Sequence, residues 1–219
     1  ASYAGTAAGN STRGIFALGY ASSPSTTRDK YTYATDANGS ATASSCASAQ
    51  GASTGNSTRG IFALALTPSR TANRNKYTYA CDTNGSATSA SCGGGYSGTA
   101  VGNSTRGIFA LGYTNTLSAN RNKYTYACDT NASAASSSTA AYNQSSAGNS
   151  TKGIFALGCA AFSLSVNRCK YTYACDANAS AASASAASGY GAAAGNSTRG
   201  IFALAYIGGG TTTTTRDKY

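Results

Sequence analysis

Fifteen of the sixteen cationic residues in this 219-residue chain recur at three equivalent positions, about 47 residues apart. The first set is Arg13, Arg59, Arg106, Lys152 and Arg199, the second is Arg28, Arg74, Arg121, Arg168 and Arg216, and the third is Lys30, Lys76, Lys123, Lys170 and Lys218. Arginine suits carboxylate, phosphate and sulfate groups because its planar guanidinium donates paired hydrogen bonds. If the copies close into a circle, these sets form three rings of positive charge that would attract an anionic ligand.

The acidic residues are too few to neutralise these cations. The chain carries six carboxylate side chains, all Asp, and a formal net charge of +10. Even if every Asp pairs with a cation of a neighbouring copy, about nine of the fifteen repeated cations remain. Those would be solvated, bound to a ligand, stacked on Tyr rings or bonded to backbone carbonyls. Two interpretations therefore stay open, a binding surface or a set of structural and solvated cations.

The composition argues against an enzyme. The chain has no His and no Glu, which removes the commonest general acid–base groups. Nucleophile–base pairs of the Ser-His or Cys-His type cannot form. We therefore expect no catalytic residues and no resident cofactor.

A second recurring group is the sequence Asp-x-Asn-x-Ser, which begins at Asp36, Asp82, Asp129 and Asp176. It matches the first half of a calcium loop, in which oxygen ligands lie two residues apart, but the downstream bidentate carboxylate is missing. Asp and Asn also form hairpin turns without any metal. We favour the turn and keep these Asp residues as weak calcium candidates.

Seven cysteines suggest possible disulfides. Cys159 and Cys169 flank one loop, and Cys81 and Cys92 flank one turn, so each pair could face across adjacent antiparallel strands. The odd number leaves at least one free thiol. The alternative is that all seven are small buried hydrophobic residues. The pairs weakly favour an oxidising, extracellular setting.

The chain consists of repeats. The octet Ser-Thr-Arg-Gly-Ile-Phe-Ala-Leu begins at Ser11, Ser57, Ser104 and Ser197, and a Lys152 variant begins at Ser150. A period of this size is typical of stacked or radially arranged copies of one supersecondary unit. We divide residues 1–219 into one domain of five repeats, 1–49, 50–95, 96–142, 143–189 and 190–219.

Each repeat is predicted to contain four short strands. In repeat 1 we place strand a within residues 1–10, strand b at Arg13–Tyr20, strand c at Arg28–Thr35 and strand d at Ala41–Ala49. Tyr and Thr favour strands, and Asn38-Gly39 is a strong hairpin signal between strands c and d. The fifth repeat stops in strand c, so its blade is incomplete.

Four antiparallel strands per repeat predict an all-β, five-bladed β-propeller. We expect a closed ring in which Phe16, Phe62, Phe109, Phe155 and Phe202 are buried at equivalent depths. The alternative is a parallel β-solenoid, whose usual rung is about half this period. No apolar run approaches the roughly 18 residues of a membrane helix.

The repeat resembles kelch-type propeller blades, and more closely the kelch-like repeats of phage tail-fibre and bacterial surface proteins. The resemblance rests on Arg106–Tyr113, where kelch repeats have an apolar strand ending in Gly-Gly, and on Asn122–Tyr126 followed by Asp129–Asn131. The chain departs from the pattern in its single or absent Gly and in having no Trp. The resemblance implies an adhesin-like or virion-associated protein outside the cell.

The segment between strands b and c varies most among the repeats, and variable loops on a rigid scaffold usually carry ligand contacts. Neutral drift is the alternative. We therefore expect a binding module that recognises a glycan or another cell-surface receptor through these loops, with Tyr20, Tyr113 and the first cation set as candidate contacts. One alternative is a structural protein that assembles with itself or a larger particle. Another is nucleic-acid or polyanion binding, which we consider unlikely because the Tyr-Thr-Tyr face belongs to the core.

Overall fold

The computed structural model describes residues 4–17, 19–20, 22–65, 69–91, 94–156, 158–161, 163–208 and 211–219. All the regular elements within these ranges are β-strands. The described part of the chain has no helix of the length and apolar character required to cross a bilayer.

The strands form five successive antiparallel sheets, which we call sheets 1 to 5. The first strands of the sheets are β1 (Thr6–Gly9), β5 (Ala52–Gly55), β9 (Thr99–Gly102), β14 (Ser145–Gly148) and β20 (Ala192–Gly195). The second strands are β2 (Arg13–Ala17), β6 (Arg59–Ala63), β10 (Arg106–Ala110), β15 (Lys152–Ala156) and β21 (Gly200–Ala203). The third strands are β3 (Arg28–Thr32), β7 (Arg74–Thr78), β11 (Arg121–Thr125), β18 (Arg168–Thr172) and β24 (Arg216–Lys218). Sheets 1 to 4 add a fourth strand, β4 (Ala37–Ala41), β8 (Thr83–Ala87), β12 (Thr130–Ala134) and β19 (Ala177–Ala181).

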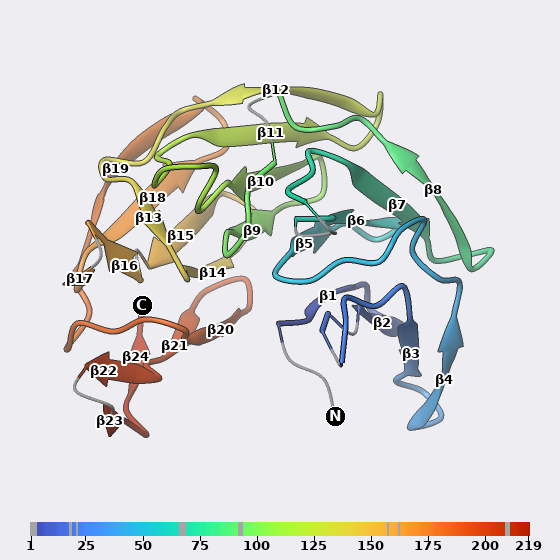
Figure 1. The fold of residues 1–219 in the computed structure, drawn as a ribbon, viewed down its shortest axis with the longest axis horizontal. Helices are drawn as coiled ribbons and strands as arrows, with labels where there is room; N and C mark the ends of the chain where they lie inside the picture. Colours follow the sequence, from blue (N-terminus) through green and yellow to red (C-terminus); the bar gives the residue numbers. More distant parts are fainter. Residues whose placement is uncertain are drawn as a thin grey trace.

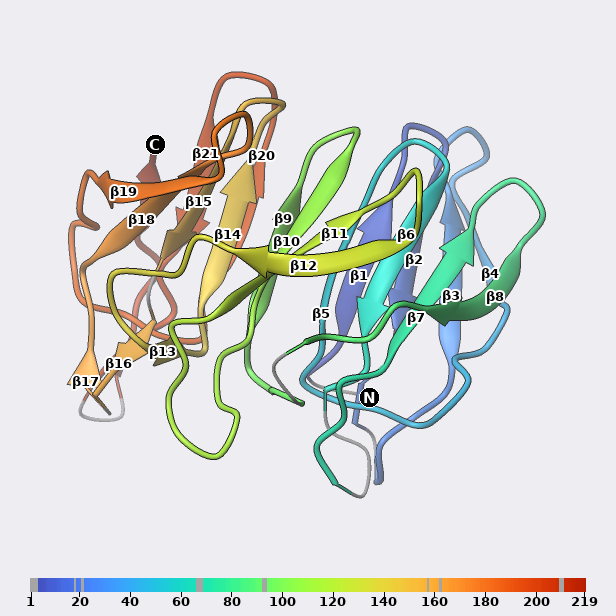
Figure 2. The ribbon, with the colours of Figure 1, turned by 90° about the horizontal axis from the view of Figure 1, so that it is seen from above.

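The sheets stand side by side around an arc (Figure 1). The first strand of each sheet lies innermost and the fourth strand lies at the rim, so the faces of neighbouring sheets pack on one another (Figures 1 and 2). Five short strands lie outside the main sheets, namely β13 (Ala141–Tyr142), β16 (Cys159–Ala160), β17 (Ser163–Leu164), β22 (Tyr206–Gly208) and β23 (Thr211–Thr212).

The second strand of each sheet has apolar side chains on both faces because it lies between two neighbouring sheets. In β2, Ile15 points toward sheet 2, where it packs against Phe62 and Tyr77. The Phe that follows each Ile points the opposite way, toward the preceding sheet. The core is therefore a series of separate clusters between sheets rather than one central mass.

The predicted strands are correct in number and order in sheets 1 to 4, but several boundaries are wrong: strand d of repeat 1, predicted at Ala41–Ala49, is β4 at Ala37–Ala41. In repeat 1 the first strand begins at Thr6, after the predicted Ala1–Gly5 segment, of which residues 1–3 lie outside the described ranges. The hairpin turn occupies residues 33–36, and Asn38-Gly39 lies inside β4. The turn closes at Asp36, whose φ is 52°, a left-handed conformation that Asp tolerates better than most residues. In the next repeat the equivalent residue, Asn84 of β8, accepts a hydrogen bond from Arg28 of the preceding sheet, so the repeat places this Asn in the strand.

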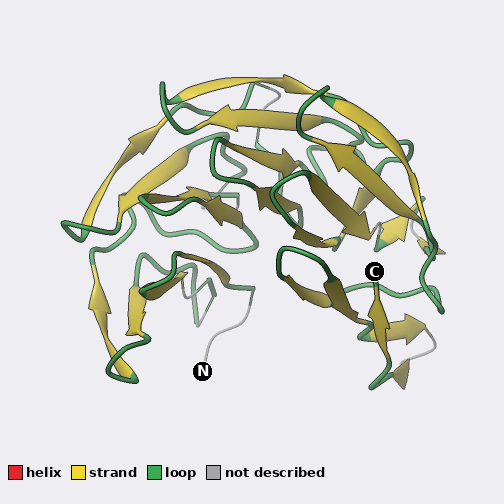
Figure 3. Cartoon of the chain, turned by 180° about the vertical axis from the view of Figure 1, so that it is seen from behind, coloured by secondary structure: helices red, strands yellow, loops and turns green. Residues whose placement is uncertain are grey.

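The expected closed ring with equivalent Phe residues is also wrong. An opening separates sheet 1 from sheet 5, as the views from the front and from behind show (Figures 1 and 3). Phe16 is 45% exposed at this opening, whereas the other four Phe residues are at most 1% exposed. Ile201 of sheet 5 is 40% exposed on the other side. Both residues lack a neighbouring sheet on the face to which they point.

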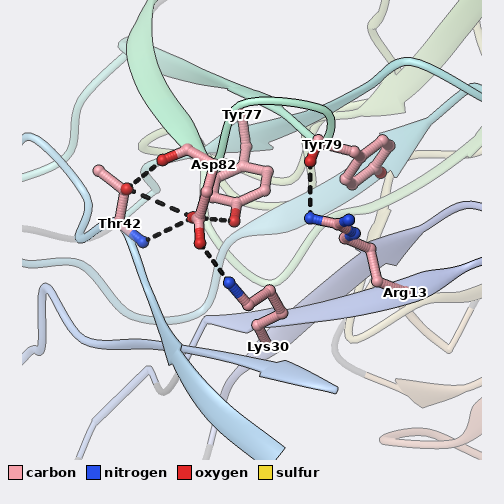
Figure 4. A network of polar contacts seen from close by, with 6 residues as sticks. All are labelled: Arg13, Lys30, Thr42, Tyr77, Tyr79 and Asp82. Carbon is pink, nitrogen blue, oxygen red and sulfur yellow. Dashed lines mark hydrogen bonds and ion pairs between the residues drawn. The ribbon is translucent and has the colours of Figure 1, made fainter. Parts of the chain in front are cut away.

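A repeated ion pair links the outer parts of neighbouring sheets. The Lys of one third strand donates to the turn Asp of the next sheet in the pairs Lys30–Asp82, Lys76–Asp129 and Lys123–Asp176. The Asp82 carboxylate also accepts hydrogen bonds from the Tyr77 hydroxyl and from the Thr42 amide (Figure 4). Partial burial acts to raise the pKa of Asp176, but hydrogen bonds from Lys123 and Tyr171 outweigh it and lower that pKa to about 2. The pKa values of Asp82 and Asp129 are lowered by the equivalent contacts.

These carboxyl groups predict a loss of stability in acid. Their pKa values lie below the unfolded value of about 3.9, so the folded state binds fewer protons and the ion pairs stabilise it above that pH. We expect the free energy of unfolding, measured by urea denaturation, to fall as the pH drops below about 4. Asp129→Asn should be less stable at neutral pH and should show a shallower acid loss. Asp36→Asn is the matched control, because Asp36 occupies the same turn but faces the opening, and it should follow the wild-type curve. Equal acid slopes for Asp129→Asn and the wild type would contradict the assignment.

Candidate functional site

The strand directions give the arc two different surfaces. Each first strand runs away from the surface that carries the segments between the second and third strands, which we call the loop face. The opposite surface carries the Asn-Ser-Thr turns and the Asp turns, and we call it the turn face. Figure 2 shows the longer connections gathered on one side of the sheets.

The second cation set is structural in the four repeats where a sheet follows. Arg28, Arg74, Arg121 and Arg168 place their guanidinium carbons 4.5, 4.4, 4.2 and 4.7 Å from the ring centres of Phe62, Phe109, Phe155 and Phe202, respectively. All four Arg side chains are buried. A guanidinium over an aromatic face is stabilised by the ring quadrupole, most strongly when water is excluded. These residues hold the sheets together and do not form a surface for ligands.

The first cation set, predicted to bind a ligand, is divided between two roles on the turn face. Arg13, Arg59 and Arg106 donate to the backbone carbonyls of Tyr79, Tyr126 and Tyr173 in the next sheet, at 2.7, 2.9 and 3.0 Å. Figure 4 shows the first of these contacts. Lys152 and Arg199 are exposed beside a hollow of about 190 Å³ between sheets 4 and 5. The first set therefore lies away from Tyr20 and Tyr113, which belong to the loop face.

The calcium candidates are used as hydrogen-bond acceptors. Asp82, Asp129 and Asp176 receive Lys, Tyr and backbone donors, and Asp36 is exposed at the opening. Within the described ranges no three His, Cys, Asp or Glu residues are grouped in a way that could hold a metal ion.

The expected disulfide between Cys159 and Cys169 is not formed. Cys159 lies in β16 opposite Leu164, whereas Cys169 lies in β18 opposite Phe155, so the two thiols belong to different sheets. Cys169 takes the place held by Asn75 and Asn122 in sheets 2 and 3 and contacts Ser138 at 3.1 Å. Cys81 is a free, exposed thiol, and its predicted partner Cys92 lies outside the described residues.

A ring of left-handed residues surrounds the inner end of the loop face. Two positions before each of the five first strands stand Ala4, Gln50, Ser97, Asn143 and Tyr190, with φ values of 56°, 56°, 54°, 51° and 57°. From the second residue on, each amide donates to the carbonyl of its counterpart in the preceding sheet, at 3.0, 3.1, 2.8 and 3.3 Å along the series. Non-glycine residues in this conformation are strained, and such strain is concentrated at functional sites. The five residues differ from one another although their backbones are equivalent.

These residues form the rim of a hollow of about 520 Å³, which we call the central mouth. It continues inward as a polar channel of about 380 Å³ lined by the first strands of all five sheets. The described residues that line the central mouth carry amide, hydroxyl and aromatic groups and no carboxylate.

Gln144 distinguishes sheet 4 from the other sheets at the central mouth. The other four sheets have Gly at this position, where the backbone of the next strand leaves little room: a Cβ on Gly98 would lie 2.1 Å from the Ala110 carbonyl oxygen. Gln144 is 9% exposed, lines both the central mouth and the channel, and donates its Nε2 to the Ala141 carbonyl at 2.7 Å. Its Oε1 has no hydrogen-bond partner among the described residues. A buried acceptor without a donor costs free energy, so Oε1 would be stabilised by any donor that came within reach of it.

Tyrosine rings flank the central mouth. Tyr96 and Tyr142 immediately precede the rim residues Ser97 and Asn143. The ring of Tyr113 lies 5.4 Å from that of Tyr96 and 6.5 Å from that of Tyr142. Arg70, the cation outside the three repeated sets, extends this cluster, with its guanidinium 5.8 Å from the Tyr96 ring and 5.5 Å from the Tyr113 ring.

The cluster continues toward sheet 5. Tyr190 is 64% exposed and stands edge-on to Tyr206, with 6.2 Å between the ring centres. Burial raises the pKa of Tyr142, with smaller effects from Cys159 and Tyr190, so its hydroxyl stays neutral at physiological pH. Of these tyrosines, Tyr190 lines the central mouth itself. Tyr113 is the one predicted contact that lies in the adjoining aromatic cluster.

Comparison with known proteins supports the fold but no family. No family model matches the chain, and no curated protein matches it. Among solved structures, the chain is similar to the one titled "Structure of YjhT", with a TM-score of 0.73 and 12% sequence identity over 91% of this chain and 71% of that one. At this identity the likeness shows the fold alone, an all-β, β-propeller-like arrangement of antiparallel sheets.

Proposed function

We propose that this protein is a non-enzymatic, kelch-like binding module of five blades that binds a glycan at the central mouth. The single observation that carries the proposal is Gln144 in the wall of the central mouth, whose buried amide oxygen meets no donor among the described residues. The module acts outside the cell or on a virion, as a fibre or adhesin tip presented to a surface receptor.

A glycan suits the chemistry of the central mouth better than other ligand classes. Sugar hydroxyls both donate and accept, and the rim offers amide and hydroxyl partners at Gln50, Ser97 and Asn143. The apolar face of a pyranose ring packs on an aromatic side chain, and Tyr190 presents such a face. Small-ligand sites are typically concave, with a few convergent polar groups, as here.

Polyanion binding through charge rings is less well supported. Four members of the second cation set are buried against Phe rings, and three members of the third set are paired with Asp. The exposed cations Lys152 and Arg199 lie on the turn face, away from the central mouth. Calcium binding by the turn Asp residues is also poorly supported. Three of these carboxylates already accept hydrogen bonds from Lys and Tyr side chains.

The ligand class can be tested with the whole chain on a glycan array and with duplex DNA, each at low and at raised salt. We expect binding to a subset of neutral glycans that changes little with salt, because neutral hydrogen bonds and stacking are not screened. Binding to DNA alone, falling steeply with salt as counterion release requires, would contradict the proposal.

A further inference from the structure

The two end faces of the arc resemble the two halves of one interface between neighbouring sheets. The acceptor face belongs to sheet 1 and consists of Phe16, Asp29, Tyr31, Tyr33 and Asp36. The donor face belongs to sheet 5 and consists of Arg199, Ile201, Arg216 and Lys218. The equivalents of Phe16 and Ile201 in the other sheets are at most 5% exposed, so each end face exposes side chains that elsewhere are covered by a neighbour.

The apolar parts of the two end faces match. Between sheets 1 and 2, Ile15 packs with Phe62, Tyr77 and Tyr79. The strand registers are the same in sheets 1 and 5, so Ile201 is the equivalent of Ile15. Phe16, Tyr31 and Tyr33 are the equivalents of its three partners.

The charges match as well. Lys30 binds the turn Asp82 of the next sheet, and Lys218 and Asp36 are the equivalents of this pair. Arg168 binds Asp217 of the next sheet at 2.8 Å, and Arg216 and Asp29 are the equivalents of that pair. Sheet 1 has an acid at this position where sheets 2 and 3 have Asn75 and Asn122, so the acceptor face is negative opposite a positive donor face.

We propose that the chain associates head to tail with a second copy of itself, the donor face of one copy binding the acceptor face of the next. The contact repeats the Lys–Asp, Arg–Asp and Ile–Phe contacts that already join the sheets within one chain. Because the two surfaces differ, the contact is heterologous, and every open assembly keeps one free donor face and one free acceptor face. This inference rests on the end faces alone and does not depend on glycan binding.

The test is the mass of the full chain in solution, measured by sedimentation over a range of protein and salt concentrations. We expect the mass to rise with protein concentration and to fall with salt, because the paired charges are screened. Asp29→Arg and Arg216→Asp each place like charges at the contact and should each raise the dissociation constant at least about tenfold. An equimolar mixture of these two variants should assemble again, because each then meets the opposite charge on the other.

Asp29→Asn is the matched control, since Asn accepts from Arg at this position between sheets 1 and 2 and should preserve assembly. Circular dichroism should show that all variants keep the β-fold. The proposal is overturned if the wild type stays monomeric at every concentration, which is also the result expected if the chain closes on itself or the opening takes a different partner. It is equally overturned if the mixed variants fail to recover assembly.

Discussion

Phe109→Ala is expected to lower the free energy of unfolding by about 3 to 5 kcal/mol, the usual cost of deleting a buried Phe side chain. Phe109 is 1% exposed and lies in the cluster between sheets 2 and 3, with the Arg74 guanidinium against its ring. The substitution removes both the ring and the surface on which the cation rests. Urea denaturation at a protein concentration where the chain is monomeric measures the change.

Phe16→Ala is the matched control for this substitution. Phe16 has the same place in the repeat but is 45% exposed at the opening, so its loss should cost about 1 kcal/mol or less. Equal losses for Phe16→Ala and Phe109→Ala would mean that sheet 1 has a neighbour on its outer face in the monomer, and the open arc would be wrong.

Arg74→Ala should cost about 3 kcal/mol, because it removes a desolvated cation from an aromatic ring together with its hydrogen bonds to the next sheet. The Arg74 side chain donates to Asn131 at 2.7 Å and to Asn122 at 3.3 Å, both in sheet 3. Burial lowers the pKa of Arg74 to about 10, so the group stays charged at neutral pH.

Arg216→Ala provides the corresponding control, since Arg216 is exposed on the donor face. In the monomer its removal should change stability by no more than about 0.5 kcal/mol. If Arg74→Ala were as mild as Arg216→Ala, the buried cations would be incidental to the packing of the sheets.

The repeat pattern was sufficient to predict the strands but not the use of their side chains. The recurring Ile-Phe pair correctly indicated a strand with two apolar faces, since both neighbours of such a strand are sheets. The second cation set was interpreted as a charged ring because arginine is usually exposed, and only the register shows that each guanidinium meets the Phe of the next sheet. The hairpin was misplaced because Asn-Gly is a strong local turn signal, whereas the equivalent Asn84 of the next repeat lies in a strand and accepts from Arg28 of the preceding sheet.

The sequence pattern did not predict the central mouth. Its rim residues differ among repeats and lie in a short connection before the first strand. The ligand contacts were instead predicted in the longer segments between the second and third strands. At the glycine position that immediately precedes each first strand, Gln144 is the exception among the repeats, and this signal is present in the sequence. The opening could not have been predicted from local patterns, because the curvature of the arc depends on how all five sheets pack.

The affinity of the strongest array glycan for wild-type protein and for Gln144→Gly tests the binding site most directly. Glycine is the residue of the other four sheets at this position, so the backbone should tolerate the change while the amide is lost. We expect the affinity to fall by about tenfold or more, as for the loss of a buried hydrogen bond, while Lys152→Ala on the turn face binds as the wild type does. Unchanged affinity in Gln144→Gly, or a comparable loss in Lys152→Ala, would contradict binding at the central mouth.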